Sequence, residues 1–204
     1  NLKRLLEYLK NLLDKNFVEF CIESNVEDIN ENFLKILLEN KVNRLSIGVQ
    51  SFNEKFTEFC GRKHTKKQAI ENIKLASKYI KNLSIDLIFA FPGQTAKDIK
   101  EDIKIVETLP IKHLSYYSLL IEPNTILFSK KIENVDDVTQ EKLYRCIYNN
   151  LKKIGFKRYE ISYFSKFKKY ESYHNKLYWK NQTYDAAGLG ASGYIDNIRY
   201  ENTR

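Results

Sequence analysis

The chain alternates short apolar runs with longer segments of helical periodicity. Runs rich in Val, Ile, Leu, Phe and Tyr predict four strands, at Phe17–Ser24, Arg44–Phe52, Leu83–Phe91 and His113–Ile121. Leucines at positions 2, 5, 6, 9, 12 and 13 predict a helix that leads into the first strand. This order is typical of repeated βα units and predicts an α/β fold, part of a TIM-like (β/α) barrel that begins partway through a repeat.

Capping motifs mark where the linking helices begin. A helix is expected to start near Asp28, and Thr65-Lys-Lys-Gln68 and Thr95-Ala-Lys-Asp98 predict two further helix starts. The pattern changes near Asn124, where a helix ending at Gly155 is followed by a predicted strand, Arg158–Phe164. We therefore expect residues 1–124 to form the C-terminal part of a barrel. Residues 125–204 would then contain the barrel end and the start of a C-terminal α+β domain.

Alternation along the strands separates apolar from polar positions. In a barrel, one set of side chains faces the helices and the other faces the interior. The set predicted to face the helices is Val18, Phe20, Ile22, Leu45, Ile47, Val49, Leu83, Ile85, Leu87 and Phe89. The interior set is Glu19, Cys21, Glu23, Ser46, Gly48, Gln50, Ser84, Asp86, Ile88 and Ala90.

This interior set is polar, and it contains carboxylates that require partners or a ligand when buried. Glu23 and Gln50 lie at the C-terminal ends of their strands, where barrel enzymes place their sites. The set predicts a ligand pocket, and a structural hydrogen-bond network is the alternative.

Composition bounds the class of protein. The 204 residues are 43% hydrophobic, which is enough for one substantial core. No apolar run reaches membrane-spanning length and no signal peptide is recognisable, so we expect a cytoplasmic protein without a membrane span. Cys21, Cys60 and Cys146 are too far apart in sequence for a metal knuckle.

The chain carries a formal charge of +8. Basic and aromatic residues interleave at Lys152–Tyr159 and Lys166–Tyr170, which makes nucleic-acid binding a third functional hypothesis. Lysines are abundant along the whole chain, however, so solvated surfaces explain the charge better and we do not expect a nucleic-acid partner. A basic surface could also receive the carboxylates of an anionic ligand.

Several motifs in fixed order resemble radical S-adenosylmethionine (SAM) proteins, in particular the group related to oxygen-independent coproporphyrinogen III oxidase. These motifs are Asn43–Asn53, Gly61–His64, Ile85–Thr95 and Tyr159–Ser162. Within this group, His-Asn-Lys-Leu-Tyr-Trp, residues 174–179, is similar to the motif of the haem chaperone branch. The resemblance runs over nearly the whole chain.

The resemblance implies two sets of binding residues. Glu23, Gln50, Arg62 and Asp86 match positions that contact SAM, whose carboxylate, amino group and ribose diol suit these side chains. His174 would be the axial haem ligand, with Asn175, Tyr178 and Trp179 in the same haem-binding motif. For His174 and Arg62 the alternative is a structural or surface residue.

The sequence departs from the resemblance in its cysteines. Radical SAM proteins hold a [4Fe-4S] cluster with Cys-x-x-x-Cys-x-x-Cys, and this spacing is missing here. We therefore interpret the chain as truncated at both ends, and expect it to be inactive alone. The resemblance implies a haem chaperone that transfers haem to an acceptor protein on a radical SAM scaffold. The alternative is a coproporphyrinogen III oxidase, which carries out oxidative decarboxylation.

Overall fold

The computed structural model describes residues 1–12 and 17–203. It divides into two compact units, residues 1–171 and residues 172–204, which are described separately. The predicted boundary after Asn124 falls within the first unit, and the 1–124 and 125–204 division stays a prediction about the whole protein. Leu13, which was assigned to the first helix, lies outside the described residues.

The first unit is built on a six-stranded sheet with the order β1-β2-β3-β4-β6-β5. The strands β1 to β4 are parallel, whereas β6 is antiparallel to both β4 and β5. Their bounds are Cys21–Asn25, Arg44–Gln50, Asn82–Phe89, His113–Ser118, Lys157–Arg158 and Tyr163–Ser165 for β1 to β6. The four predicted strands are therefore present in the predicted order, as the parallel part of an open sheet.

The first strand starts later than predicted, because a side chain binds the segment before it. The Asn43 carboxamide accepts from Phe20 N at 2.8 Å and donates to Val18 O at 3.1 Å. The prediction that Val18 packs against helices is wrong, since this residue is 71% exposed.

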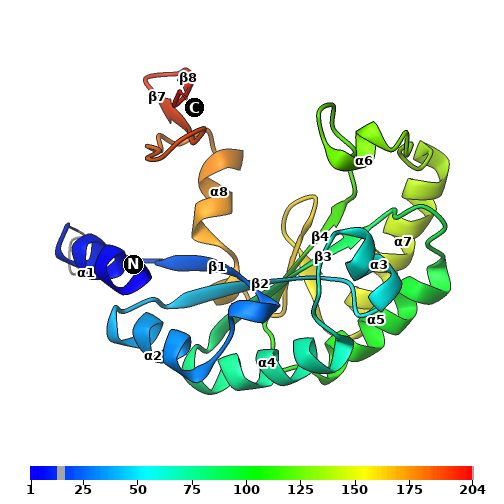
Figure 1. Ribbon diagram of the computed structural model, residues 1–204, viewed down its shortest axis with the longest axis horizontal. Helices are drawn as coiled ribbons and strands as arrows, with labels where there is room; N and C mark the ends of the chain where they lie inside the picture. The colour runs from blue at the N-terminus through cyan, green and yellow to red at the C-terminus, as the bar shows by residue number, and fades with distance from the viewer. Residues whose placement is uncertain (13–16, 204) are drawn as a thin grey trace. The chain divides into compact units, whose positions relative to one another are not determined.

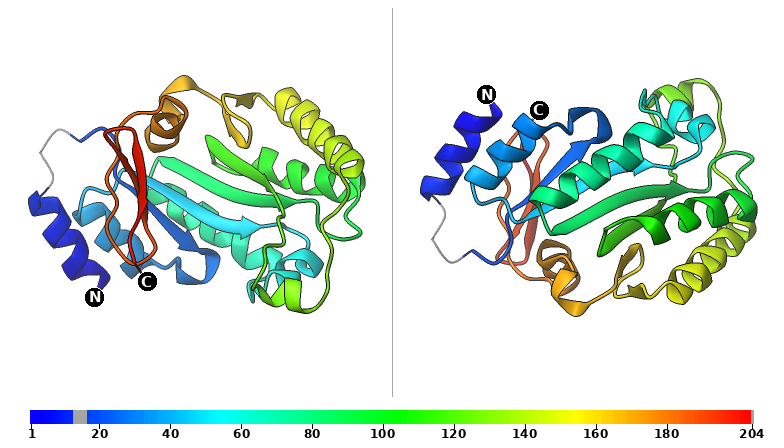
Figure 2. Two further views of the ribbon diagram at one scale, coloured as in Figure 1. Left: turned by 90° about the horizontal axis from the view of Figure 1, so that it is seen from above. Right: turned by 90° about the horizontal axis from the view of Figure 1, so that it is seen from below.

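Helices cover one face of this sheet, as Figure 1 shows for α2, α4 and α5. Figure 2 shows the same helices in front of the strands when the chain is viewed from below. Helices α1 to α7 span Leu2–Leu12, Glu31–Glu39, Glu54–Phe59, Lys66–Tyr79, Ala96–Thr108, Ile126–Ser129 and Asp137–Lys153; 3-10 turns η1 and η2 span Val26–Asp28 and Lys168–Tyr170. Both predicted capping boxes are present, at Thr65 with Gln68 and at Thr95 with Asp98.

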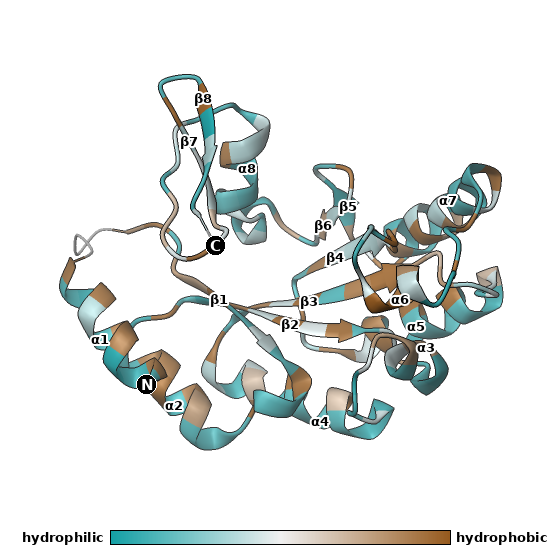
Figure 3. Cartoon of the chain, turned by 45° about the horizontal axis from the view of Figure 1, so that its top comes forward, coloured by the Kyte–Doolittle hydropathy of each residue, from teal (hydrophilic) through white to brown (hydrophobic). Residues whose placement is uncertain are grey.

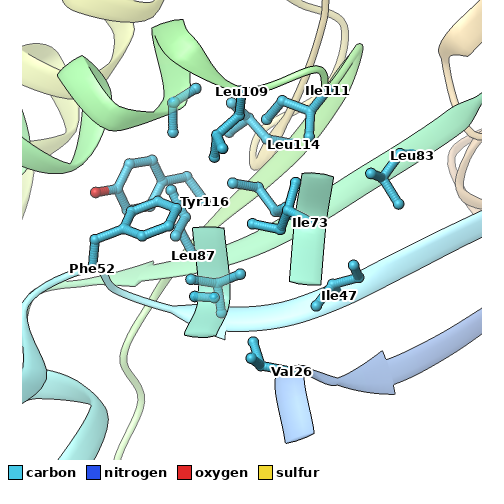
Figure 4. Close-up of a cluster of buried hydrophobic side chains, with 14 of the residues drawn as sticks. Val26, Ile47, Phe52, Ile73, Leu83, Leu87, Leu109, Ile111, Leu114 and Tyr116 are labelled. Carbon is cyan, nitrogen blue, oxygen red and sulfur yellow. The ribbon is translucent and has the colours of Figure 1, made fainter. Parts of the chain in front are cut away.

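The core lies between the sheet and these helices. It contains the apolar set predicted for β2 and β3, with Ile47, Ile85 and Leu87 fully buried. Figure 4 shows Leu83 and Leu87 of β3 close to Ile73 of α4, and Figure 3 shows hydrophobic colour on these central strands. Burying each such side chain stabilises the fold by roughly 1.5–3 kcal/mol. The other face of the sheet is left for polar side chains.

The predicted strand Arg158–Phe164 is wrong as a single element. The structure places two short strands there, β5 and β6, joined by a turn. Tyr159 N donates to Tyr163 O at 3.1 Å and Ser162 N donates to the Glu160 side chain at 2.6 Å. The turn contains neither Gly nor Pro, so the sequence carried no strong signal for it.

The second unit contains one short helix and a hairpin. Helix α8 spans Tyr173–Trp179, and strands β7 and β8 span Ser192–Ile195 and Ile198–Glu201. The hairpin turn has positive φ angles at Asp196 and Asn197, which these two residue types tolerate well. Among the described residues, no helix is long and apolar enough to cross a membrane.

Candidate functional site

The carboxyl ends of β1, β2 and β3 surround a pocket of about 740 Å³. All four residues implied as SAM contacts line this pocket, which also has Asn25, Gly48 and the acidic turn η1 in its wall. The four residues are Glu23, Gln50, Arg62 and Asp86. They come from three strands and from the loop before α4, so the fold brings together side chains up to 63 positions apart, Glu23 to Asp86.

Asp86 lies half-buried on β3 and is held by serines on both neighbouring strands. Ser46 Oγ of β2 donates to its carboxylate at 2.9 and 3.0 Å, and Ser115 Oγ of β4 donates from the other side. Burial raises the pKa of Asp86 to about 6, although both serine hydrogen bonds oppose the shift. The negative charge of Glu23 raises this pKa further and the Arg44 guanidinium lowers it.

Arg62 reaches the pocket from the loop after α3. Its guanidinium donates to the Asn25 carboxamide oxygen, and its backbone N–H donates to Thr57 O at 2.9 Å. Arg62 is therefore held by contacts within the first unit and lies in the pocket wall.

A glycine on β2 lets two of these side chains approach one another. A Cβ atom added to Gly48 would lie 3.0 Å from Gln50 Nε2 and 3.9 Å from Arg62. A side chain at position 48 would therefore force the Gln50 carboxamide to shift. The interior position predicted for Gly48 is the one that the structure shows.

Sequence reasoning missed Ser115 and the pair of Glu27 and His64. The signal for Ser115 is the alternation along β4, where His113, Ser115 and Tyr117 share one period of two residues. His64 Nδ1 lies 3.2 Å from Glu27 Oε1, and its Nε2 lies 3.2 Å from Val49 O. Both neighbours of the ring are hydrogen-bond acceptors.

A second polar cluster continues along the same face on β4 and β6. The buried His113 bonds Ser84 Oγ and Tyr159 Oη, both at 2.7 Å, and Tyr117 and Tyr163 bond through their hydroxyls. Burial holds the pKa of His113 well below its usual range, which keeps the ring neutral. The face therefore combines a carboxylate-lined pocket with a neutral, phenol-rich region.

In the second unit, the residues implied for haem binding lie on α8. The cap residue Ser172 accepts from Asn175 N at 3.3 Å. His174 and Tyr178 are one helical turn apart, and Tyr178 Oη lies 2.8 Å from His174 Nε2 with the rings edge to face at 4.7 Å. Trp179 is 59% exposed, and it points about 140° around the helix from His174, at 100° per residue.

The Tyr178 ring packs edge to face on Tyr184 at 4.5 Å, so the motif extends beyond the helix. Imidazole beside exposed aromatic rings suits a planar metal macrocycle. If His174 bound iron through Nε2, the hydrogen bond between Nε2 and the Tyr178 hydroxyl would have to break.

The cysteines do not supply a cluster site. All three cysteines are free: Cys21 lies on β1, Cys60 directly after α3, and Cys146 on α7. Burial raises the pKa of the Cys21 thiol to about 12. Within residues 1–12 and 17–203, no group of three His, Cys, Asp or Glu side chains could hold a metal ion. The residues described here therefore do not fit a [4Fe-4S] cluster, whereas the pocket chemistry fits SAM.

Parallel βα units with a polar pocket at the strand ends define the first unit as an α/β barrel fragment of the kind that enzymes use. The family model "Radical SAM superfamily" matches residues 1–106, and the chain belongs to this superfamily. Membership of that superfamily implies SAM and a [4Fe-4S] cluster as cofactors of the whole protein.

Relatives and solved structures extend the comparison. The chain is 36% identical to "Heme chaperone HemW" of Lactococcus lactis, over 98% of this chain and 54% of the relative. It is 35% identical to the protein of the same name from Bacillus subtilis, over 98% and 55%. The structure of coproporphyrinogen III oxidase (HemN) from Escherichia coli matches with a TM-score of 0.79 at 20% identity, over 98% of this chain and 51% of that one. The chain thus spans about half the length of the curated relatives it matches.

Proposed function

We propose that the protein is a haem chaperone, which binds haem through α8 and transfers it to an acceptor protein. The observation that carries this proposal is the pairing of His174 with Tyr178 on one face of α8, beside Tyr184. The names of the relatives from Lactococcus lactis and Bacillus subtilis support it. His174 is proposed as the axial ligand, with Asn175 as part of the same haem-binding motif and Trp179 offering further apolar surface.

The test is a haem titration followed by the Soret band. His174→Ala in the whole protein should weaken haem binding at least about tenfold, since a lost iron–imidazole bond costs more than 1.4 kcal/mol. Lys180→Ala is the matched control, because Lys180 is an exposed residue at the end of the same helix. If the His174 variant kept the affinity and spectrum of the wild type, the ligand assignment would be lost.

We further propose that the pocket of the first unit binds SAM. Arg62 would contact the SAM carboxylate, while Glu23, Gln50 and Asp86 would accept from its amino group and ribose hydroxyls. When bound with a cluster, SAM supplies one-electron chemistry. The residues of this chain bind and orient it. Arg62→Ala and Asp86→Ala should each weaken SAM in calorimetric titration of the cluster-loaded protein and leave haem binding intact.

The alternative function is that of a coproporphyrinogen III oxidase, favoured by the structural match to the Escherichia coli enzyme, which shows the fold alone. The reaction product separates the two. The whole protein, given coproporphyrinogen III, SAM and a reductant, should form no decarboxylated product, yet should release bound haem to an apo-haemoprotein. Chromatographic detection of product at catalytic turnover would establish the oxidase, and His174 would then be a structural residue.

A further inference from the structure

Gln50, one of the pocket residues, has a backbone conformation that few non-glycine residues adopt. Its φ angle is +68°. Ser51 N donates to Val49 O at 2.9 Å, which closes a three-residue γ-turn around Gln50. The pairing of β2 with β3 also shifts by one residue between Gly48 and Gln50. A γ-turn with positive φ is rare and strained, so it persists only where neighbouring groups enforce it.

The group that enforces this turn is a buried carboxylate on another helix. Asp102 of α5 is 2% exposed and accepts two hydrogen bonds from the residues that follow Gln50. Ser51 Oγ donates to Oδ2 at 2.9 Å, and Phe52 N donates to Oδ1 at 3.0 Å. Ser51 Oγ also accepts from Asn53 N at 3.0 Å, so the clamp extends to the cap of α3.

The two oxygens of Asp102 fix both ends of the segment after the turn. A single acceptor would hold either the Ser51 side chain or the Phe52 backbone and leave the chain free to relax toward ordinary strand geometry. A carboxylate therefore suits this position better than an amide. An amide has only one acceptor oxygen, and its NH2 group would point at either the Phe52 N–H or the Ser51 hydroxyl, which are themselves donors.

The clamp acts at a distance from the pocket. Asp102 is not among the residues that line the cavity, whereas Gln50 is. Asp102 interacts electrostatically with three titratable groups: Asp98 on its own helix, Lys66 at the start of α4, and Tyr116 on β4. A buried carboxylate with two donors on a strained turn needs a reason, because an apolar residue in that position would pack without the penalty for burying a charge.

We infer that Asp102 is a positioning residue, which holds the γ-turn at Gln50 and thereby presents the Gln50 carboxamide to the SAM pocket. This inference rests on the proposed SAM site. The Gly48 position explains why orientation matters there, since Gln50 Nε2 passes within 3.0 Å of where a Cβ at position 48 would be. A turn that relaxed would rotate the carboxamide out of that narrow space.

The test uses SAM affinity of the cluster-loaded whole protein, measured by calorimetry. Asp102→Asn should weaken SAM binding by a factor on the order of ten. Glu101→Gln is the control, because Glu101 directly precedes Asp102 on α5, is exposed, and its replacement removes the same charge. In a Gln50→Ala background, Asp102→Asn should have almost no further effect on affinity. If Asp102→Asn lowered SAM affinity equally in both backgrounds, the inference would be overturned. It would also be overturned if Asp102→Asn left SAM affinity unchanged while Gln50→Ala lowered it.

A stability measurement separates the clamp from the SAM assignment. Gln50→Gly relieves the strain, since glycine adopts φ of +68° freely. Asp102→Asn should therefore lower the urea midpoint of unfolding less in the Gln50→Gly background than in the wild type. If Gln50→Ala left SAM affinity unchanged, the proposed contact between Gln50 and SAM would be wrong. The stability comparison would then test the clamp by itself. A smaller loss of the urea midpoint in the Gln50→Gly background would support the clamp, and equal losses in both backgrounds would overturn it. Ser51→Ala removes the Oδ2 contact and the hydrogen bond that Ser51 Oγ accepts from Asn53 N, but keeps the Phe52 N–Oδ1 bond. It replaces Asp102→Asn if that variant does not fold.

Discussion

Asp86 is predicted to destabilise the folded protein at neutral pH. Its pKa is raised from 3.8 to about 6, and each pKa unit corresponds to about 1.4 kcal/mol. Ionised Asp86 therefore costs the folded state about 3 kcal/mol relative to its protonated form. Because the folded pKa is raised, its contribution to stability is fully present below about pH 4 and is lost as the pH rises through about 6.

Replacing Asp86 with Asn should remove this penalty. The Asn carboxamide can still accept from Ser46 and Ser115, although these bonds become weaker when the acceptor loses its charge. We therefore expect the ligand-free variant to be more stable than the wild type by between about 1 and 3 kcal/mol at pH 7.5. Below pH 4 the advantage should vanish.

The assay is urea unfolding followed by far-ultraviolet circular dichroism, at steps between pH 4 and pH 8 without SAM. The quantity to compare is the difference in unfolding free energy between Asp86→Asn and the wild type at each pH. Asp102, whose pKa burial also raises to about 6, titrates in both proteins and cancels in this difference. A variant that is less stable than the wild type at pH 7.5, or a difference that does not change with pH, would refute the reasoning.

Two further predictions concern the second unit. Gly193→Ala should unfold the β7–β8 hairpin or destabilise it by about 1–3 kcal/mol, because the new Cβ would overlap the Tyr200 ring. The fluorescence of Trp179, the single tryptophan, reports on this change, and an unchanged urea midpoint would contradict the prediction. Tyr178→Phe should keep haem binding or tighten it up to about tenfold, because His174 Nε2 would no longer give up a hydrogen bond to reach iron. A Tyr178→Phe variant as defective as His174→Ala in the Soret titration would instead point to the phenol as ligand.

The first unit was predictable from sequence where periodicity and capping agree. The helix from Thr65 combines a capping box with apolar residues on one face, and the structure shows both. The strand Arg158–Phe164 failed because its turn, stabilised by the Glu160 side chain, has no glycine or proline. Helix α8 was not predicted, since seven residues with three aromatic rings have no apolar period to detect.

The site was predictable to a different degree. Alternation along β1 to β3 placed Glu23, Gln50 and Asp86 on one face, and the pocket contains all three. Arg62 could not be found in this way, because its loop has no period and its place depends on the tertiary contact with Asn25. No sequence pattern indicated the role proposed for Asp102. On α5 this residue lies on the same buried face as the apolar residues that pack into the core.

The unfavourable features of the first unit are concentrated at one end of the sheet. Strand β2 ends in a non-glycine residue with positive φ, Gln50 at 68°, and β3 is followed directly by another, Ala90 at 62°. Asp86 and Asp102 lie buried or half-buried nearby with raised pKa values. Each strained residue costs about 1–3 kcal/mol. The opposite, helix-covered face has an ordinary apolar core that offsets these costs. A fold under selection for stability alone would have no reason to retain backbone strain and buried carboxylates in the same region, whereas a pocket that must hold a charged ligand in one orientation requires both.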